Sequence, residues 1–269
     1  MNQSKGKEHS VQQNSISGSS SDVVNTVDGQ VDHRVVELRD TLQRLPLQVT
    51  DEMCEQLLSF YAQLIKKNEV MNLTAITEYQ EVVEKHFLDS LSLIYVCDPA
   101  GKRVLDLGTG AGFPGIPLKI VFPDTSMVLA DSLQKRLRFL QEVIENCHLQ
   151  EIETVHGRAE DLGKVNAPWR ESFDVCVSRA VANLSSLSEY CLPFVKVGGC
   201  FVSYKSGDAQ EETKQAEKAI RILGGKIEQT KTFQLPGTEL GRTLILIRKI
   251  KPTPKQYLRK AGLPGKQPL

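Results

Sequence analysis

The sequence has no long apolar run, no closely spaced cysteine pair and no excess of charge of either sign. No stretch of its 269 residues approaches the length of a membrane span, and the N-terminus lacks the apolar segment of a signal peptide, so we expect a cytoplasmic protein without membrane contact. The six cysteines form no CxxC pair and no Cys/His cluster with zinc-ligand spacing. We therefore predict buried, incidental thiols and no metal site.

The balance of charge is even overall and uneven along the chain. The protein has 33 Lys and Arg residues and 33 Asp and Glu residues, which argues at first against a polyanionic partner. From residue 241 to the end, however, there are eight Lys or Arg residues and no Asp or Glu. This basic segment suits a surface that contacts phosphate, and it equally suits a solvated tail.

Composition and periodicity divide the chain into four parts. Residues 1–34 are rich in Ser, Gln, Asn and Gly, and they predict a disordered tail because they hold too little apolar surface to offset the cost of ordering. Residues 35–98 predict a helical extension, in which one helix ends at Pro46, a second starts after Thr50 as N-cap, and a third runs over 78–97. Residues 99–250 form the core, and 251–269 a basic C-terminal tail.

In the core, short apolar runs alternate with amphipathic segments, which is typical of a parallel sheet covered by helices. The last two strands predict an antiparallel pair. We therefore expect an α/β fold with a doubly wound, mostly parallel, seven-stranded, Rossmann-like sheet. The expected strands are 103–107, 126–131, 152–157, 173–178, 200–205, 226–235 and 242–250.

A glycine-rich turn follows the first expected strand in the run VLDLGTGAGFPGIPLK, residues 104–119. Gly108, Gly110 and Gly112 form GxGxG, which lets the chain turn sharply from strand to helix and lets a ligand approach the backbone. Such ligands bind at the carboxyl ends of the strands. The loops that follow the strands are therefore the place to look for a site.

The residues around this turn distinguish two candidate ligands. A dinucleotide fingerprint is GxGxxG, but here position 113 is Phe. Asp106 stands just before the turn, where a carboxylate would repel a pyrophosphate and attract a cation. A ligand with a positive amino acid end, a sulfonium and no phosphate fits these signs, which favours S-adenosylmethionine.

The ends of the next three strands supply further candidates. Asp131 is placed to bind ribose hydroxyls, although it could equally stabilise the start of the following helix. Ala159 and Glu160 follow the third strand, where the adenine edge would lie, and Glu160 could also be an ordinary surface residue. Arg179 follows the fourth strand and is either a ligand contact or a structural ion-pair donor.

Two polar residues of the helical extension have two interpretations each. His86 and Asn72 are most simply a satisfied core histidine and a helix-terminal asparagine. Alternatively, the extension lines a substrate pocket beside the cofactor. Lys205, after the fifth strand, is placed to meet a phosphate group.

Six runs together resemble the bacterial 16S ribosomal RNA guanine-N7 methyltransferases, the glucose-inhibited division protein B family. The resemblance extends from about residue 50 to the end of the sheet, in order and with natural spacing. The runs are KKNEVMNLTAIT (66–77), KHFLDSL (85–91), VLDLGTGAGFPGIPLKIVFP (104–123), DSLQKRLRFL (131–140), GRAED (157–161) and SRAV (178–181).

This resemblance implies a class I S-adenosylmethionine-dependent enzyme, a monomer, that methylates N7 of one guanosine in 16S ribosomal RNA, free or in the small ribosomal subunit. The alternatives are a small-molecule methyltransferase on the same fold and a non-catalytic ribosome-assembly factor. The implied cofactor contacts are Gly108, Phe113, Asp131, Ser132, Leu133, Ala159, Glu160 and Arg179, supported by Asp106, Gly110 and Gly112 in the loop.

Guanine N7 carries no proton, so its lone pair can attack a methyl group without a general base, and we expect no catalytic base. The basic C-terminal part supplies the candidate RNA contacts. We expect charge reversals at Lys249 and Lys251 to weaken RNA binding and to leave cofactor affinity intact. The candidate RNA contacts are Lys205, Arg248, Lys249 and Lys251.

Overall fold

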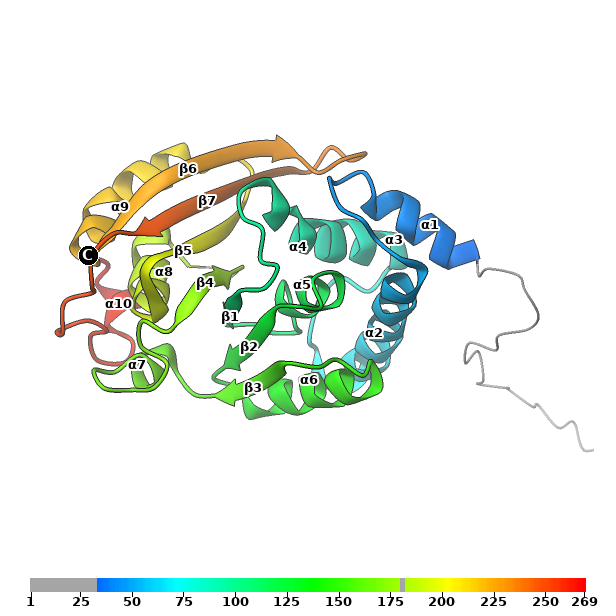
Figure 1. The fold of residues 1–269 in the computed structure, drawn as a ribbon, viewed down its shortest axis with the longest axis horizontal. Coiled ribbons are helices and arrows are strands. Elements are labelled where there is room, and N and C mark those ends of the chain that lie inside the picture. The colour runs from blue at the N-terminus through cyan, green and yellow to red at the C-terminus, as the bar shows by residue number, and fades with distance from the viewer. Residues whose placement is uncertain (1–32, 180–181) are drawn as a thin grey trace, which may run out of the picture. The chain divides into compact units, whose positions relative to one another are not determined.

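The computed structural model describes residues 33–179 and 182–269 of the chain (Figure 1). Contacts divide the chain into two units, 1–32 and 33–269, and only the second is described here. The disordered tail predicted for 1–34 therefore lies almost wholly outside the described residues. Its last two residues do not: helix α1, His33–Leu42, already includes them.

Helix α2, Asp51–Met71, confirms the predicted capping. The Thr50 hydroxyl accepts a hydrogen bond from the backbone N–H of Met53, which satisfies one of the free donors in the first turn. Asn72 ends the helix in the left-handed conformation, with φ 49°, as a helix-terminal asparagine can.

The prediction of a single helix over 78–97 is wrong in detail, because the type of helix changes three times along this stretch. Helix α3, Tyr79–Val82, leads into a π-helical turn η1, Val83–Leu88, followed by α4, Asp89–Leu91, and a 3₁₀ turn η2, Ser92–Tyr95. A π-helical turn inserts extra backbone into a helix and is frequent at functional sites. Here it includes His86.

The seven strands form one mixed sheet in the order β3-β2-β1-β4-β5-β7-β6. The first five are parallel, and β7 lies antiparallel between β5 and β6, which confirms the doubly wound prediction with a terminal antiparallel pair. The strands are β1 Arg103–Leu107, β2 Ser126–Asp131, β3 Ile152–His156, β4 Phe173–Ser178, β5 Val195–Ser206, β6 Gly225–Gln234 and β7 Gly241–Lys249.

Helices cover both faces of this sheet (Figure 1). On one face, α5, Gly115–Val121, and α6, Gln134–Asn146, pack together with α2 in one apolar core. On the other face, α8, Leu184–Cys191, and α9, Gln210–Ile222, build a second core. All six cysteines are buried and free, as predicted. Among the described residues, no helix is both long and apolar enough to span a membrane.

Residues 251–269, which the sequence predicts as a basic tail, pack against the core. Their only α-helix is α10, Leu263–Lys266, which contacts α8. The Arg170 guanidinium donates hydrogen bonds to the carbonyl oxygens of Thr253 and Tyr257, at 2.9 and 2.7 Å. A basic residue of the core therefore helps to hold this segment in place.

Candidate functional site

The glycine turn and the short helix α7, Ala159–Leu162, lie at the carboxyl edge of the parallel strands, as expected. Gly108 and Gly110 have φ of 76° and 61°, a region that side chains with a Cβ rarely adopt. A Cβ on Gly108 would meet no atom within 4 Å, so the turn leaves open space above its backbone. The backbone N–H of Gly110 donates to Asp131 Oδ2 at 3.0 Å, which joins the turn to the end of β2.

Asp106 lies beneath this turn and does not face a ligand. Its side chain is fully buried, and Oδ2 accepts hydrogen bonds from the Thr109 hydroxyl at 2.7 Å and from the Gly115 N–H at 2.9 Å. The expectation of a carboxylate that directly meets a cation is therefore corrected: Asp106 shapes the turn. Its Oδ1 is buried without a partner among the described residues, and burial raises the pKa of Asp106 to about 6.

This raised pKa makes a testable prediction for Asp106→Asn. The folded protein binds the Asp106 proton more tightly than the unfolded chain, so the stabilisation is present below pH 4 and is lost as the pH rises through about 6. The asparagine variant keeps an acceptor for Thr109 and Gly115 and cannot titrate. We expect the free energy of unfolding of the wild type, relative to the variant, to fall by roughly 2–3 kcal/mol between pH 4 and pH 7. Urea unfolding of both proteins across this pH range checks the prediction. The same dependence of unfolding free energy on pH in the wild type and the variant would contradict it.

A cavity of about 260 Å³, the cofactor cavity, opens at the ends of β1 to β4. It brings together five of the predicted cofactor contacts and excludes three, Phe113, Leu133 and Arg179, from its wall. Its lining residues are Leu107, Gly108, Ala130, Asp131, Ser132, Gly157, Arg158, Ala159, Glu160, Ser178, Leu187, Tyr190 and Cys191.

Asp131 has spare acceptor capacity in this cavity. Its Oδ1 accepts from the Leu133 N–H at 2.8 Å, and its Oδ2 accepts from Gly110 and, at a longer 3.3 Å, from Arg136. A carboxylate offers about four lone-pair sites, so at least one remains for a ribose hydroxyl. Leu133 thus acts here through its backbone, while its side chain is exposed. The open turn and Asp131 fit S-adenosylmethionine.

Phe113, a cofactor contact that the family resemblance implies, packs in the core and does not line the cofactor cavity. Its side chain is 5% exposed and stacks on His86, with ring centroids 4.3 Å apart, and it contacts Phe60 at 5.2 Å. The Arg179 guanidinium lies 5.2 Å from the Phe113 ring centroid on the side of the polar residues. Phe113 therefore connects the glycine turn to the helical extension.

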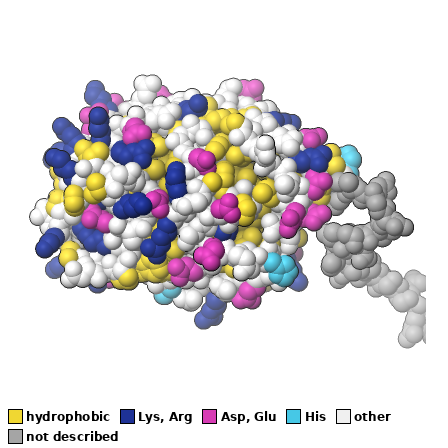
Figure 2. Space-filling model, in the orientation of Figure 1, with side chains coloured by type: hydrophobic (Ala, Val, Ile, Leu, Met, Phe, Trp, Pro, Cys, Tyr) yellow, Lys and Arg dark blue, Asp and Glu magenta, His cyan; other side chains and the backbone are white. Residues whose placement is uncertain are grey.

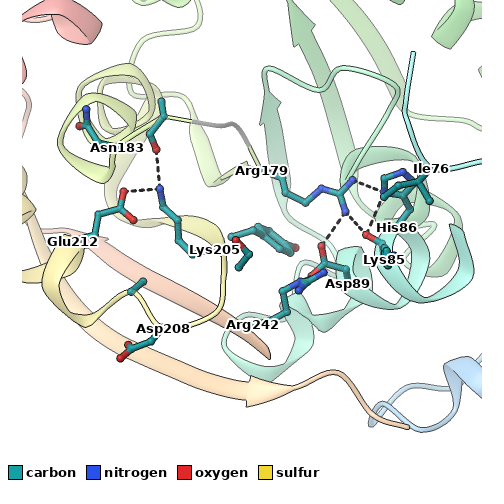
Figure 3. Close-up of a pocket in the computed structure, with 14 residues that line it drawn as sticks. Ile76, Lys85, His86, Asp89, Arg179, Asn183, Lys205, Asp208, Glu212 and Arg242 are labelled. Carbon is teal, nitrogen blue, oxygen red and sulfur yellow. Dashed lines mark hydrogen bonds and ion pairs between the residues drawn. The ribbon is translucent and has the colours of Figure 1, made fainter. Parts of the chain in front are cut away.

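A second and larger cavity of about 800 Å³, the polar cavity, is lined by residues from η1, the end of β4, β5, α9 and β7 (Figure 3). Ser178, the last residue of β4, lines the cofactor cavity, and Arg179, the next residue, lines the polar cavity. Consecutive residues at the end of β4 therefore line the two cavities. His86, in the helical extension, and Lys205, in β5, also line the polar cavity.

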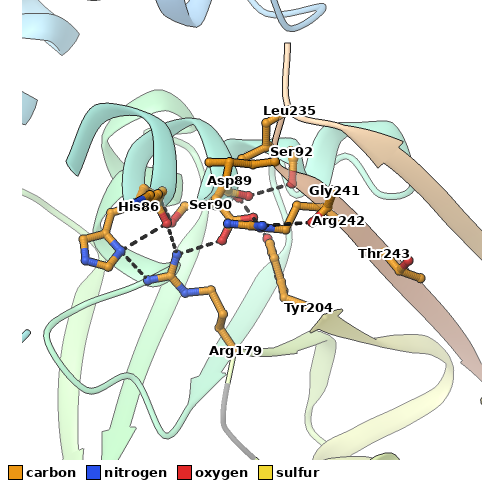
Figure 4. A network of polar contacts seen from close by, with 12 residues as sticks. His86, Asp89, Ser90, Ser92, Arg179, Tyr204, Leu235, Gly241, Arg242 and Thr243 are labelled. Atoms are coloured by element: carbon orange, nitrogen blue, oxygen red, sulfur yellow. Dashed lines mark hydrogen bonds and ion pairs between the residues drawn. The ribbon is translucent and has the colours of Figure 1, made fainter. Parts of the chain in front are cut away.

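Asp89 is the centre of the polar network in this cavity (Figure 4). Its Oδ2 accepts from Arg179 Nη1 and its Oδ1 from Arg242 Nε, both at 2.9 Å, and its side chain is only 5% exposed. Arg179 also donates to the Lys85 carbonyl oxygen and to His86 Nδ1, each at 3.0 Å. Arg179 is thus an ion-pair donor and a cavity residue at once.

His86 is a neutral, fully bonded residue. Burial, with a contribution from Arg179, lowers the pKa of His86 to about 3. Because a guanidinium only donates, the contact with Arg179 requires a free lone pair on Nδ1, and Nε2–H then donates to the Thr74 hydroxyl at 3.0 Å. The prediction of a satisfied core histidine is confirmed.

Asp89 and Arg242 were not singled out from the sequence as site residues. Asp89 lies inside the run KHFLDSL. The one feature of the sequence that could have indicated it is a charged residue on an otherwise apolar helical face. Arg242 was one of eight basic residues near the C-terminus. Only the pairing of β7 with β5, which sets Arg242 beside Ser206, shows that it reaches the same cavity.

The four candidate RNA contacts lie at opposite ends of the sheet. Lys205 lines the polar cavity, where its Nζ donates to Glu212 at 2.7 Å and to the Ala182 carbonyl oxygen at 2.8 Å. Arg248 pairs with Cys200 in the middle of β5, whereas Arg242 pairs with Ser206 at its end. Arg248 and the two lysines that follow it therefore lie away from the strand ends that form the cavities.

The prediction that Lys249 is a surface contact for RNA is wrong. Its side chain is buried, and its Nζ donates to the carbonyl oxygens of Leu192 and Val195 and to the Thr253 hydroxyl, with Glu171 3.1 Å away. Burial lowers the pKa of Lys249 to about 8. A charge reversal here would disturb folding and is no probe of RNA binding. Other Lys and Arg side chains gather over α9, β6 and the C-terminal segment, among acidic ones (Figure 2).

The order of the strands, the open glycine turn and the acidic residue at the end of β2 define a class I S-adenosylmethionine-dependent methyltransferase. A solved structure titled M. jannaschii TYW2 in complex with AdoMet shares this fold, with a TM-score of 0.51 at 12% identity over 65% of this chain and 80% of that one. At this identity the likeness shows the fold alone.

The family is shown by sequence. The model of the GidB family, rRNA small subunit methyltransferase G, matches residues 53–240, and the chain belongs to this family. The ribosomal RNA small subunit methyltransferase G of Lachnoclostridium phytofermentans is 53% identical over 85% of this chain and 94% of its own length. That of Acetivibrio thermocellus is 49% identical over 81% and 90%. The predicted family, enzyme class and cofactor are thereby confirmed.

Proposed function

We propose that the protein transfers a methyl group from S-adenosylmethionine to N7 of a guanosine in 16S ribosomal RNA of the small subunit. The observation that carries this proposal is that two consecutive residues at the end of β4, Ser178 and Arg179, line two different cavities. A cofactor held in one cavity can present its methyl group toward a base held in the other. The names and identities of the relatives support the RNA substrate over a small molecule.

Bound S-adenosylmethionine supplies an electrophilic methyl group on a sulfonium. The residues of this chain have only to hold the two reactants in line, because the N7 lone pair needs no base. The neutral His86 fits this requirement, since its Nδ1 lone pair is occupied by Arg179. Positioning of this kind can lower a barrier by roughly 7–11 kcal/mol.

The charges around the polar cavity suit a polyanionic substrate. Arg179, Arg242, Lys85 and Lys205 come from four separate elements and line it together. Three carboxylates, among them that of Asp89, line the same cavity and offset part of this charge. Asp89 also holds the two guanidinium groups in place, so that they are ordered before a substrate arrives. Phosphate contacts of ordered Arg and Lys side chains position RNA without reading its sequence.

Incubation of the protein with labelled S-adenosylmethionine and small subunits that lack the modification tests the proposal. We expect label in 16S RNA and strand scission at one 7-methylguanosine. An Asp131→Ala variant, which removes the carboxylate at the end of β2, serves as the negative control. Label in a small molecule only, or cofactor binding without any transfer, would support one of the alternatives and overturn the proposal.

We also propose that the protein acts as a monomer in the cytoplasm, where its substrate is made. The large exposed apolar side chains among the described residues come from separate elements, such as Val70 in α2 and Val197 in β5, and this scatter supports a monomer. Sedimentation at micromolar concentration checks the oligomeric state. A dimer would contradict it.

A further inference from the structure

A buried ion pair between Arg259 and Glu189 holds the segment 251–269 next to the cofactor cavity. We call this segment the C-terminal strap. Glu189 in α8 is fully buried, and both of its oxygens accept from Arg259: Oε1 from the backbone N–H and Nε, Oε2 from Nη2 at 2.6 Å. A buried carboxylate held this way fixes the chain at Arg259. The next residue of α8, Tyr190, lines the cofactor cavity.

Beyond this anchor, the strap touches elements of the cavity wall. The Pro264 carbonyl oxygen accepts from the buried Ser186 hydroxyl at 2.6 Å. Gly265 packs against Tyr190, because a side-chain carbon on this glycine would lie 3.6 Å from the Tyr190 hydroxyl oxygen. The backbone N–H of Gly262 donates to Glu160 Oε1 at 2.9 Å, across 102 residues of sequence.

The position of Glu160 indicates which part of the cofactor it meets. In the sheet, β2 lies between β3 and β1, so Asp131 stands between the glycine turn and Glu160 along the cavity. If the ribose binds Asp131 and the amino acid end lies over Gly108, the adenine lies on the side of β3, beside Glu160. Among the described residues, Glu160 Oε2 accepts no hydrogen bond, while Oε1 is held by the strap.

We propose that the C-terminal strap is a part of the cofactor site, in which the Gly262 N–H positions Glu160 so that its second oxygen accepts a hydrogen bond from the adenine amino group. Glu160 and Gly262 together then select adenine over a base that lacks the amino group. This inference rests on the proposed use of S-adenosylmethionine and adds a residue that acts through another, since Gly262 itself need not touch the cofactor.

Calorimetric titration with two ligands tests this role without any methyl transfer. S-adenosylhomocysteine carries the amino group, whereas S-inosylhomocysteine has an oxygen in its place, which a carboxylate repels. We expect the wild type to prefer the adenine ligand by at least about tenfold, the size of one charge-assisted hydrogen bond. Truncation after Lys260, and a semisynthetic chain in which an ester replaces the amide between Ala261 and Gly262 and so removes only the Gly262 N–H, should each reduce this preference to below about threefold. Lys260→Ala, an exposed change in the strap, should leave it unchanged.

A double-mutant cycle separates positioning from a general loss of structure. If the strap acts through Glu160, truncation should lower adenine-ligand affinity about tenfold in the wild type and hardly at all in Glu160→Gln. Equal losses in both backgrounds, or a preference for adenine that survives the ester replacement at Gly262 in a folded protein, would overturn the inference. Failure of the proposed function is a separate result, because it would appear as no binding of the adenine ligand by the wild type.

Discussion

Gly112→Ala should lower the free energy of unfolding by about 2–5 kcal/mol and abolish cofactor binding. Gly112 has φ of 100°, and a Cβ there would lie 2.8 Å from Leu140 Cδ2 and 2.9 Å from Ile116 Cγ1. Both neighbours are fully buried, so neither can move into open space. Overpacking of this kind costs roughly 1–3 kcal/mol, and the strained backbone adds about 1–2 kcal/mol. Urea unfolding and calorimetric titration with S-adenosylhomocysteine measure the two effects.

Gly198→Ala is a matched control for the backbone strain alone. Gly198 in β5 has φ of 91°, and a Cβ there would meet no atom within 4 Å. We expect this variant to lose only about 1–2 kcal/mol and to bind the cofactor normally. If the two variants lose the same free energy of unfolding, the close packing around Gly112 is not the cause.

Asp89→Asn should reduce methyl transfer by about 100-fold while cofactor affinity stays within threefold. The amide keeps one acceptor oxygen and sets an NH₂ group against the second guanidinium, so either Arg179 or Arg242 loses its partner. Loss of one side of a buried pair also costs roughly 3–5 kcal/mol of stability. A displacement of about 1 Å at a reacting group can cost two orders of magnitude in rate. Single-turnover transfer to small subunits measures the rate.

Asp208→Asn is the corresponding control, because Asp208 is an exposed carboxylate on the wall of the same cavity and forms no ion pair within 4.0 Å among the described residues. Its replacement by asparagine changes the charge of the cavity by the same amount. The variant also keeps the side-chain oxygen that accepts a hydrogen bond from the Gln210 backbone N–H. We expect less than a threefold change in rate. A similar loss in both variants would show that net charge matters and the Asp89 geometry does not.

The sequence predicts the sheet and the cofactor turn well because these depend on local patterns. Apolar runs, glycine spacing and an acidic residue at a strand end are all read within about 30 residues of one another. The polar cavity depends instead on distant pairing: Arg242 meets Asp89 across 153 residues, and no local pattern reports such a contact. The broken helix over 79–95 was missed because π and 3₁₀ turns leave the apolar spacing almost unchanged.

A run of basic residues in the sequence does not show where each of its residues lies in the structure. The eight basic residues near the C-terminus include Arg242 in the polar cavity, Lys249 in the interior and Arg259 in an ion pair with a buried glutamate. A buried lysine of this kind looks the same in the sequence as a solvated one. Its role follows only from the carbonyl oxygens that converge on its ammonium group.

The two outer strands of the sheet bear on how the protein behaves at high concentration. At one edge, β6 presents exposed Lys226 and Glu228, and its register with β7 shifts at Glu228. At the other edge, β3 presents exposed Glu153. A strand of a second molecule that paired with either edge would lie next to these charged side chains. At the β6 edge, the shifted register would also interrupt the row of backbone hydrogen bonds. The same sheet that holds the cofactor turn at its carboxyl end is thus protected along its sides from growth into aggregates.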